Sequence, residues 1–498
     1  MGQPRVVIIG AGFGGIGMAV RLRQEGYDDV VIVERSEGVG GTWRDNTYPG
    51  AACDVPSHLY SFSFHPGTWR RRFSEQPDIL RYLEDVVRIH GLERHLRTST
   101  EVEALVFDER WDRWEVRLSG GEVLHADAVV SGVGQLNRPY VPDLPGLGDF
   151  AGPVWHSARW RHDVDLTGRR VAVVGTGASA IQFVPEVAEV AEHVTVFQRS
   201  APYVLPKPDR AYDAAYRRRR ARIPGLIRAT RAIQYLRHEV VTHAFISSPR
   251  MVDASYRLWE QQLHRQVADP QLRRRVTPDY TIGCKRVLIS NDWYPTLMRD
   301  DVDLVASPVA RVSADAVVSD DGHEHPCDAL ILGTGFRSTD FLMPMRVVGR
   351  DGRDLHEVWH DGAEAYRGVT VAGFPNLFLL YGPNTNLGTN SILYMLESQF
   401  TYVLESLRTL EREGLAWMDV TEHAQARYNE QVQQASEGTV WETGCTSWYT
   451  TPDGRNTNNW PAYTFQYRQV TKQVDLGDHL VMPRRPVQAP TAVAAGEG

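Results

Sequence analysis

Residues 6–15 read VVIIGAGFGG, and residues 171–180 read VAVVGTGASA. Each stretch starts as an apolar, largely β-branched run, continues as a GxGxxG or GxGxxA turn, and leads into a sequence with helical apolar spacing. This order predicts a strand, a tight turn and a helix that bind a dinucleotide. The glycines let the backbone approach the pyrophosphate, and the start of the helix offers unpaired N–H groups. Two such stretches in one chain predict two dinucleotide sites.

The two copies differ only slightly in their glycine pattern. In the second copy Ala180 replaces the third glycine, at a position where only close packing of the helix is required. The residues expected to line the pyrophosphate sites are Gly10, Gly12 and Gly15 in the first copy and Gly175, Gly177, Ala178 and Ser179 in the second.

The residues after the next strand distinguish the two nucleotides. Residues 30–33 are followed by Glu34, whose carboxylate suits the ribose hydroxyls of an adenosine that has no 2′-phosphate. Residues 194–197 are followed, after one glutamine, by Arg199 and Ser200, and a guanidinium suits a 2′-phosphate. Glu34 and Arg199 each lie 24 positions after the first glycine of their copy. We therefore expect FAD at the first site and NADPH at the second.

Length and composition agree with a multidomain protein. The chain has 498 residues, 42% of them hydrophobic, which suits two or three domains with full cores. Its net charge of −8 does not favour nucleic acid as a partner. The first strand begins close to Met1 and no long apolar run occurs, so we expect no targeting peptide, no membrane span and a cytoplasmic location. The expected partner is a small molecule, and the sequence does not distinguish a monomer from a dimer.

The cysteines are scattered and form no CxxC pair. They are Cys53, Cys284, Cys327 and Cys445. This pattern suits a reducing cytosol and argues against a disulfide framework and against a metal cluster.

The fold class predicted is α/β, with two Rossmann-like dinucleotide-binding domains, the NADPH domain being inserted into a discontinuous FAD domain. Two short strands, DAVVSGVG at 127–134 and DALILGTGF at 328–336, are expected to carry the chain into and out of the FAD domain. An Arg- and Ala-rich region is expected to form a small helical subdomain with a solvated basic face. The predicted division is 1–144 for the first part of the FAD domain, 145–325 for the NADPH domain with the helical insertion at about 209–275, 326–484 for the second part of the FAD domain, and 485–498 for a flexible tail.

Between the glycine stretches, residues 150–160 read FAGPVWHSARW, which fits FxGxxxHxxxW. This pattern resembles the fingerprint of the Baeyer–Villiger monooxygenases, although Arg161 stands where the family usually has Pro or Asp. In that family the fingerprint histidine affects interdomain movement, so we do not expect His156 to be an acid or a base. Further segments similar to the family are GGTW at 40–43, YPGAACDVPSHLYSFSF at 48–64, GCKRVLISNDWYPTL at 283–297, GPNTNLGTNS at 382–391 and SWY at 447–449.

The resemblance implies a reaction and a set of site residues. NADPH would reduce the flavin, and a flavin peroxide formed with O₂ would convert a ketone into an ester or lactone. Arg286, which is always charged, would stabilise the anionic peroxide and the later oxyanion, and Asp54 would orient its guanidinium. The implied cofactor-binding residues, besides those of the glycine stretches and Glu34, Arg199 and Ser200, are Gly41, Thr42, Trp43, Asp54, Lys285, Asn390 and Trp448.

Individual roles follow from the same resemblance. Lys285 is assigned to the 2′-phosphate of NADPH, and Trp448 is a candidate lid residue. The loop 382–391 is expected to lead into a helix at Ile392 and to place backbone N–H groups near the flavin. Aromatic residues expected to keep water from the site are Trp43, Tyr60, Trp293 and Trp448.

Three other functions fit the two nucleotide sites. A flavin-containing monooxygenase that oxygenates sulfur or nitrogen shares both folds, but it lacks this form of fingerprint and the Arg286 segment. A disulfide reductase requires a cysteine pair, which the spacing does not offer. A redox flavoprotein without turnover would oxidise NADPH slowly, and no ketone would stimulate it.

Overall fold

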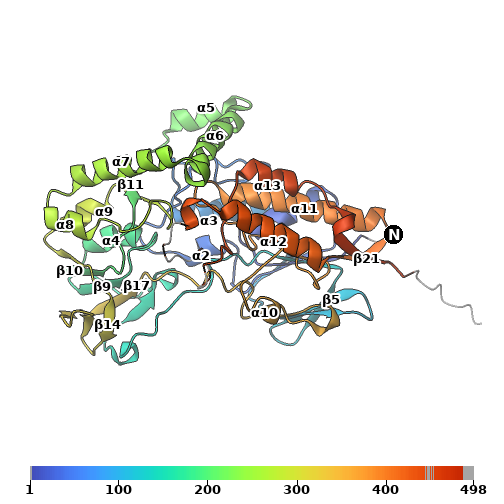
Figure 1. The fold of residues 1–498 in the computed structure, drawn as a ribbon, viewed down its shortest axis with the longest axis horizontal. Coiled ribbons are helices and arrows are strands. Elements are labelled where there is room, and N and C mark those ends of the chain that lie inside the picture. The colour runs from blue at the N-terminus through green and yellow to red at the C-terminus, as the bar shows by residue number, and fades with distance from the viewer. Residues whose placement is uncertain (1–2, 443–444, 446–448, 450, 452–453, 486–498) are drawn as a thin grey trace, which may run out of the picture.

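A computed structural model describes residues 3–442, 445, 449, 451 and 454–485 of the chain. Within these residues the chain forms two five-stranded parallel sheets, four smaller sheets and a set of covering helices (Figure 1). Trp448 and all but the first residue of the 485–498 tail lie outside the described residues, so the predictions for them are not addressed.

The first glycine stretch lies in the first parallel sheet. β1 (Val6–Ile9) is its central strand, fully buried and flanked by β7 (Ala128–Ser131) and β2 (Val30–Val33). β3 (Leu96–Arg97) extends the β2 edge, and β19 (Leu377–Leu379) extends the β7 edge. Because β19 comes from far along the chain, this sheet is built from two separate parts of the sequence, as predicted.

The second glycine stretch lies in the second parallel sheet. Its strand order is β13 (Val302–Val305), β10 (His193–Phe197), β9 (Arg170–Val174), β17 (Ala329–Leu332) and β8 (Val154–His156). One sequence prediction is wrong here. The strand of DALILGTGF was assigned to the FAD domain from residue 326, but β17 pairs with β9 and β8. The second sheet therefore extends to Leu332, and the other predicted boundaries remain a proposal.

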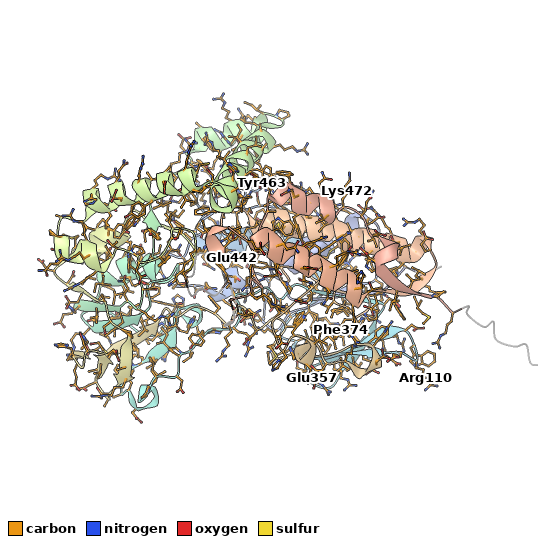
Figure 2. The ribbon with its side chains drawn as sticks, viewed as in Figure 1. Arg110, Glu357, Phe374, Glu442, Tyr463 and Lys472 are labelled. Atoms are coloured by element: carbon orange, nitrogen blue, oxygen red, sulfur yellow. A yellow bond between two sulfur atoms is a disulfide. The ribbon has the colours of Figure 1, made fainter. Side chains whose placement is uncertain are left out.

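The smaller sheets are mostly antiparallel and attach to the two main ones. Their strands are β18 (Arg346–Val348), β4 (Val102–Asp108), β5 (Arg113–Leu118) and β6 (Val123–Ala126) in one, β14 (Val309–Val312), β15 (Ala316–Ser319) and β16 (Glu324–Pro326) in another, and the pairs β11 (Val204–Leu205) with β12 (Leu288–Ile289) and β20 (Leu415–Val420) with β21 (His479–Pro483). Phe374, labelled in Figure 2, is buried in the core shared by the four-stranded sheet and one face of the first sheet.

Helices cover the sheets and form one separate group. The helical region expected at about 209–275 is present as α5 (Ala214–Arg222), α6 (Leu226–Ser247), α7 (Pro249–Gln266) and α8 (Pro270–Arg275), shown in green and yellow in Figure 1. The remaining α-helices are α1 (Phe13–Gln24), α2 (Thr42–Asp45), α3 (Gln76–Ile89), α4 (Ala180–Ala188), α9 (Trp293–Leu297), α10 (Leu355–Val358), α11 (Ile392–Arg412), α12 (Glu422–Ser436) and α13 (Thr464–Val470). No helix in the described part of the chain has both the length and the apolar character needed to cross a bilayer.

Close backbone packing holds α1 in place between the first sheet and α11. A Cβ atom added at Gly17 would lie 2.6 Å from the ring of Phe400 on α11. At Gly15 it would lie 1.9 Å from the carbonyl oxygen of Gly10. The two helices can therefore cross closely, and α1 starts directly against the first glycine turn.

Candidate active site

One cavity of about 1170 Å³ connects the two glycine turns. It is lined by residues from both parallel sheets, from the 40–60 segment and from the 285–288 segment. The predicted site residues that line it are Gly10, Gly12, Glu34, Gly41, Thr42, Trp43, Asp54, Gly175, Gly177, Ala178, Ser179, Arg199, Ser200, Lys285, Arg286 and Asn390. Of the predicted catalytic and cofactor-binding residues that the structure describes, only Gly15 is absent from the cavity wall, because it is packed against the turn behind it.

The first glycine turn fits a dinucleotide pyrophosphate. Gly10 has φ +94°, and a Cβ atom there would lie 2.8 Å from the carbonyl oxygen of Gly132, so only glycine is tolerated. At Gly12 the nearest atom to an added Cβ would be the Cα of Gly41, at 3.8 Å. A side chain at this position would therefore extend into the cavity rather than into protein. α1 begins here with neither a side-chain cap nor an acidic residue in its first turn, which leaves its N–H groups for an anion.

Glu34 lies at the end of β2 with both carboxylate oxygens fixed. One oxygen accepts a hydrogen bond from the backbone N–H of Ala11 at 2.7 Å, and the other accepts one from Ser36 at 2.8 Å. Each oxygen keeps a further lone pair, and the residue lines the cavity. This geometry fits an acceptor for ribose hydroxyl groups beside the first turn.

The GGTW segment forms the wall next to this turn. Gly41 has φ +53° and precedes α2, and an added Cβ would lie 3.1 Å from the Cα of Gly12. Trp43 donates a hydrogen bond from Nε1 to the hydroxyl of Tyr60 at 3.0 Å, and both rings line the cavity. Trp293, expected to line the site, is instead 1% exposed in the core of the second sheet.

The second glycine turn repeats the arrangement of the first. Gly175 has φ +109°, and an added Cβ would lie 2.5 Å from the carbonyl oxygen of Gly333. A Cβ at Gly177 would have no protein atom within 4 Å, although the residue lines the cavity. α4 follows with no acidic residue in its first turn. The second turn therefore also fits a pyrophosphate.

A positively charged group lies beside the second turn. Lys285 donates a hydrogen bond from Nζ to Oγ of Ser200 at 3.0 Å, and its ammonium lies 4.5 Å from the ring centre of Tyr280. Burial, followed by the charge of the neighbouring Arg199, lowers the pKa of Lys285 from its ordinary value. Lys285 and Arg199 both line the cavity, and their positive charges repel each other. A dianion such as a 2′-phosphate would neutralise both charges, so this place suits it.

Arg286 and Asp54 form an ion pair in the cavity wall. The guanidinium donates from Nε to Oδ2 of Asp54 at 3.0 Å and from Nη2 to the same oxygen. Burial opposes ionisation of Asp54, but the charge and hydrogen bonds of Arg286 outweigh it and lower the pKa of the carboxyl group. The carboxylate is in turn the main cause that raises the pKa of Arg286. The two side chains are 30% and 29% exposed, so the permanent cation faces the cavity.

Asn390 is held by a residue of the helical region. Its Nδ2 donates to Oε1 of Glu239 on α6 at 2.8 Å, and Glu239 also accepts from the hydroxyl of Thr464. α11 begins at Ile392, as predicted, and its cap residue Ser391 accepts a hydrogen bond from a backbone N–H of the first turn. The loop before α11 is thus fixed by a residue of α6 that does not line the cavity.

The fingerprint residues lie behind the site. His156 ends β8, is 5% exposed and does not line the cavity. Burial lowers its pKa from the ordinary value. Trp160 packs against Tyr48 and Phe183, which belong to the two halves of the molecule. These positions agree with a structural role for His156 and Trp160 where the two halves of the molecule meet. Arg161 is exposed and pairs with Asp163.

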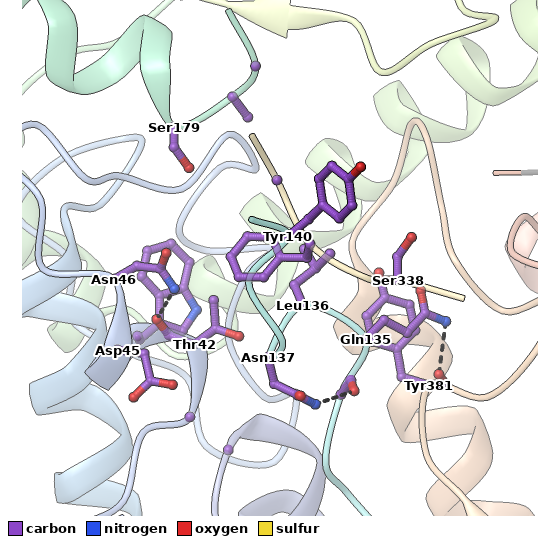
Figure 3. Close-up of a pocket in the computed structure, with 18 of the residues that line it drawn as sticks. Thr42, Asp45, Asn46, Gln135, Leu136, Asn137, Tyr140, Ser179, Ser338 and Tyr381 are labelled. Carbon is purple, nitrogen blue, oxygen red and sulfur yellow. Dashed lines mark hydrogen bonds between the residues drawn. The ribbon is translucent and has the colours of Figure 1, made fainter. Parts of the chain in front are cut away.

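Sequence reasoning missed two cavity residues that contact each other. Gln135 donates from Nε2 to the backbone oxygen of Tyr381 at 3.0 Å (Figure 3). The hydroxyl of Tyr381 donates to Oδ1 of Asn386 at 2.6 Å. Gln135 follows β7 at the same sheet edge as the glycine turn, so strand-end logic could have found it. Tyr381 has φ +60°, which no sequence pattern indicated.

The expectation that the cysteines form no disulfide is wrong. Cys284 and Cys445 form one, 161 residues apart, whereas Cys53 and Cys327 are free and buried. Sequence spacing could not show this pairing, because the two residues are brought together only by the fold. Neither sulfur lines the cavity, so the pair is not placed as the redox centre of a disulfide reductase.

The fold and the site define an oxidoreductase with two dinucleotide sites that share one cavity. The family model for pyridine nucleotide-disulphide oxidoreductases matches residues 7–242. A Baeyer–Villiger monooxygenase of Pseudomonas aeruginosa is 48% identical over 474 residues, which cover 95% of this chain and 90% of the relative. A solved structure of an oxidised steroid monooxygenase bound to NADP is 31% identical, with a TM-score of 0.87 over 97% of this chain and all of that one. The chain belongs to the Baeyer–Villiger monooxygenase family.

A more distant relative performs a different oxygenation. The phenazine N-monooxygenase PhzNO1 of Lysobacter antibioticus is 31% identical over 87% of this chain and 88% of the relative. Similarity over nearly the whole chain thus extends to an enzyme named for oxygenation at nitrogen.

Proposed function

We propose that this protein uses FAD, NADPH and O₂ to insert one oxygen atom beside a ketone carbonyl, giving an ester or lactone. The observation that carries the proposal is the Arg286–Asp54 ion pair in the wall of the cavity that both glycine turns line. Bound FAD, reduced by NADPH, supplies the chemistry that activates O₂. The residues of this chain bind the two nucleotides, hold them apart from bulk water and stabilise charge.

The two glycine turns divide the cofactors between them. We assign FAD to the first turn, where Glu34 would accept hydrogen bonds from the ribose and the uncapped start of α1 would bind the pyrophosphate. We assign NADPH to the second turn, where Arg199, Ser200 and Lys285 receive the 2′-phosphate. Asn390, Thr42 and Trp43 complete the wall on the FAD side.

Arg286 is the proposed catalytic residue. Negative charge develops on oxygen when the ketone carbonyl is attacked, and a fixed guanidinium at that place stabilises it without reorganisation. Asp54 orients the guanidinium through two hydrogen bonds to one oxygen and keeps it charged. A lysine in the same place would be able to lose its proton, since its pKa falls more readily on burial.

The test combines isotope labelling with an Arg286→Ala variant. The enzyme is incubated with NADPH, ¹⁸O₂ and a panel of linear, cyclic and aryl ketones, and products are analysed by mass spectrometry. We expect one labelled oxygen in the ester. Arg286→Ala should still oxidise NADPH but lose about 100-fold or more in ester formation, the usual cost of removing one fixed group that stabilises an oxyanion. Arg286→Lys should also be strongly impaired.

Arg346→Ala is the matched control, because the Arg346 side chain is 70% exposed and does not line the cavity. It should retain wild-type ester formation. Unchanged ester yield in Arg286→Ala would remove Arg286 from its role.

Oxygenation of sulfur or nitrogen is the second candidate, and the similarity to the phenazine N-monooxygenase favours it over the remaining alternatives. It predicts that sulfides or amines are oxygenated readily while the ketone panel yields only hydrogen peroxide. A redox flavoprotein without turnover would show slow NADPH oxidation that no member of either panel stimulates.

We also propose that the protein works in the cytoplasm, the compartment that supplies NADPH. Fractionation of host cells should recover it with cytoplasmic marker enzymes, and recovery with periplasmic or membrane markers would contradict this.

A further inference from the structure

The disulfide joins two segments that meet next to the catalytic arginine. Cys284 is 0% exposed and directly precedes Lys285 and Arg286 in the chain. Cys445 is half-buried and follows the short turn of residues 440–442, whose end is marked by Glu442 in Figure 2. All four cysteines belong to the described residues, so this is the one disulfide of the chain. It is the only covalent tie between the two segments other than the backbone itself.

The same two segments also meet through packed side chains. Val440, Trp441 and Tyr449 form a small buried cluster with Phe245 of α6. Gly283 packs so tightly on Phe245 that an added Cβ would lie 2.3 Å from its ring. The same added Cβ would also lie 3.0 Å from a side-chain carbon of Val440, so the two segments touch directly. The position of the arginine segment is therefore coupled to those of Val440, Trp441, Cys445 and Tyr449.

We propose that Cys284 and Cys445 form a reversible redox site, oxidised by hydrogen peroxide, which fastens the Lys285–Arg286 segment when the disulfide is present. The Cα atoms are 6.2 Å apart, a separation that a disulfide tolerates and that two thiols also tolerate. In a reducing compartment, disulfides are usually transient and serve catalysis or redox sensing. A permanent structural bond would not be expected at this place.

The oxidant, hydrogen peroxide, comes from the enzyme's own oxidation of NADPH by O₂. In this respect the inference rests on the proposed function. Without a productive substrate, NADPH, H⁺ and O₂ give NADP⁺ and H₂O₂. Cys445 is the more exposed of the two residues, so its thiol reacts first, forming a sulfenic acid and releasing one water. The thiol of Cys284 then attacks the sulfenic sulfur, the S–S bond forms, and the hydroxyl group leaves as a second water. Two thiols lose two electrons in total, and one peroxide gains them.

Reduction by a dithiol breaks the disulfide, restores the two thiols and loosens the Lys285–Arg286 segment. In the disulfide form Arg286 is held on Asp54 and Lys285 on Ser200. When the tie is open, the cation is positioned less firmly, so a larger share of the electrons from NADPH should end in peroxide. Peroxide formation would thereby restore the disulfide and limit itself.

The first part of the test measures the bond directly. Holoenzyme is reduced with dithiothreitol under nitrogen, the reductant is removed, and stoichiometric H₂O₂ is added. Differential alkylation and peptide mass spectrometry should show loss of two thiols and appearance of the 284–445 cross-linked peptide, with Cys53 and Cys327 unchanged. A pair that resists dithiothreitol in the folded protein, or that stays reduced in excess peroxide, overturns the proposal. This readout does not depend on any oxygenation product.

The second part measures the consequence for turnover. With a ketone that is a substrate, the reduced enzyme and Cys445→Ser should release at least twice as much H₂O₂ per NADPH as the oxidised enzyme. Cys327→Ala is the matched control, because Cys327 is buried, free and outside the cavity wall. It should respond to dithiothreitol like the wild type. If the bond opens and closes but peroxide release is equal in both states, the role in fastening Arg286 is wrong.

If no ketone is a substrate, the readout is the KM for NADPH, which the position of Lys285 sets in either state. If the KM for NADPH is equal in the oxidised and the reduced enzyme, the proposed role of the disulfide in fastening the Lys285–Arg286 segment is wrong. A chain in which the disulfide forms but no ketone is oxygenated would contradict the proposed function alone.

Discussion

Two cations beside the second glycine turn should decide between NADPH and NADH. Arg199→Ala and Lys285→Ala each remove one proposed charged partner of the 2′-phosphate, and such contacts contribute about 1.5–3 kcal/mol. We therefore expect kcat/KM for NADPH to fall about 10- to 100-fold in each variant, while kcat/KM for NADH stays nearly constant. Steady-state NAD(P)H oxidation with both coenzymes measures the ratio.

The exposed Arg346→Ala variant again serves as the control and should keep the wild-type coenzyme ratio. An equal loss with NADH and NADPH would mean that the cations support the protein rather than the phosphate.

At the scale of residues, the sequence predicted what local spacing encodes. Glu34 and Arg199 were predicted because each follows a strand at a fixed distance from a glycine turn, and both line the cavity. The pair of Arg286 with Asp54 is separated by 232 positions, and only the family resemblance indicated it. The Cys284–Cys445 bond had no such precedent and was missed.

Helix α1 offers a test at the scale of elements. In Gly15→Ala the new Cβ would lie 1.9 Å from the carbonyl oxygen of Gly10, so α1 must move away from the turn that it follows. Strain of this kind costs about 1–3 kcal/mol. We expect a lower unfolding temperature and loss of FAD on desalting, measured by thermal unfolding and by flavin absorbance per protein.

Gly148→Ala is the matched control, because an added Cβ there has no atom within 4 Å. It should change neither quantity. Full FAD retention and wild-type stability in Gly15→Ala would show that the turn and the helix are not packed as described.

The elements themselves were more predictable than their partners. The β-branched runs and the glycine turns indicated strands and helix starts, and the helical region appeared as α5–α8. β17 was nevertheless assigned to the wrong sheet. DAVVSGVG and DALILGTGF are almost the same pattern, and both strands are fully buried. A short buried strand carries no signal for which neighbour it will pair with.

At the scale of the whole molecule, the two nucleotide-binding halves are joined around the cavity. Gln182 on α4 accepts a hydrogen bond from the backbone N–H of Ala52 and donates one to its carbonyl oxygen. Arg231 on α6 donates to backbone oxygens of His58, Leu59 and Ser61. The segment that carries Asp54 is thus held by α4, which packs on the second sheet, and by α6 of the helical region. The position of the Asp54 segment therefore depends on α4 and α6 as well as on the first sheet.

Buried histidines make the stability of the whole protein depend on pH. His58 is 3% exposed, and neither ring nitrogen has a hydrogen-bond partner among the described residues. Burial, followed by the charge of Arg220, lowers its pKa from 6.5 to about 4. In the unfolded chain His58 therefore becomes protonated below pH 6.5, whereas in the folded chain it stays neutral down to about pH 4. The contribution of neutral His58 to stability is complete above pH 6.5 and is lost as the pH falls.

We expect the free energy of unfolding to fall by about 1.4 kcal/mol per pH unit for each such histidine between its two pKa values. Burial also lowers the pKa values of His65, His90, His156, His238 and His479. In His58→Phe the new ring can still stack on Tyr212. The slope of the free energy of urea unfolding against pH, between pH 6.5 and 5, should decrease by the amount that corresponds to uptake of about one proton. His360→Gln, which replaces a side chain that is 85% exposed, should leave the slope unchanged. An equal slope in the wild type and His58→Phe would mean that His58 becomes protonated in the folded protein despite its burial.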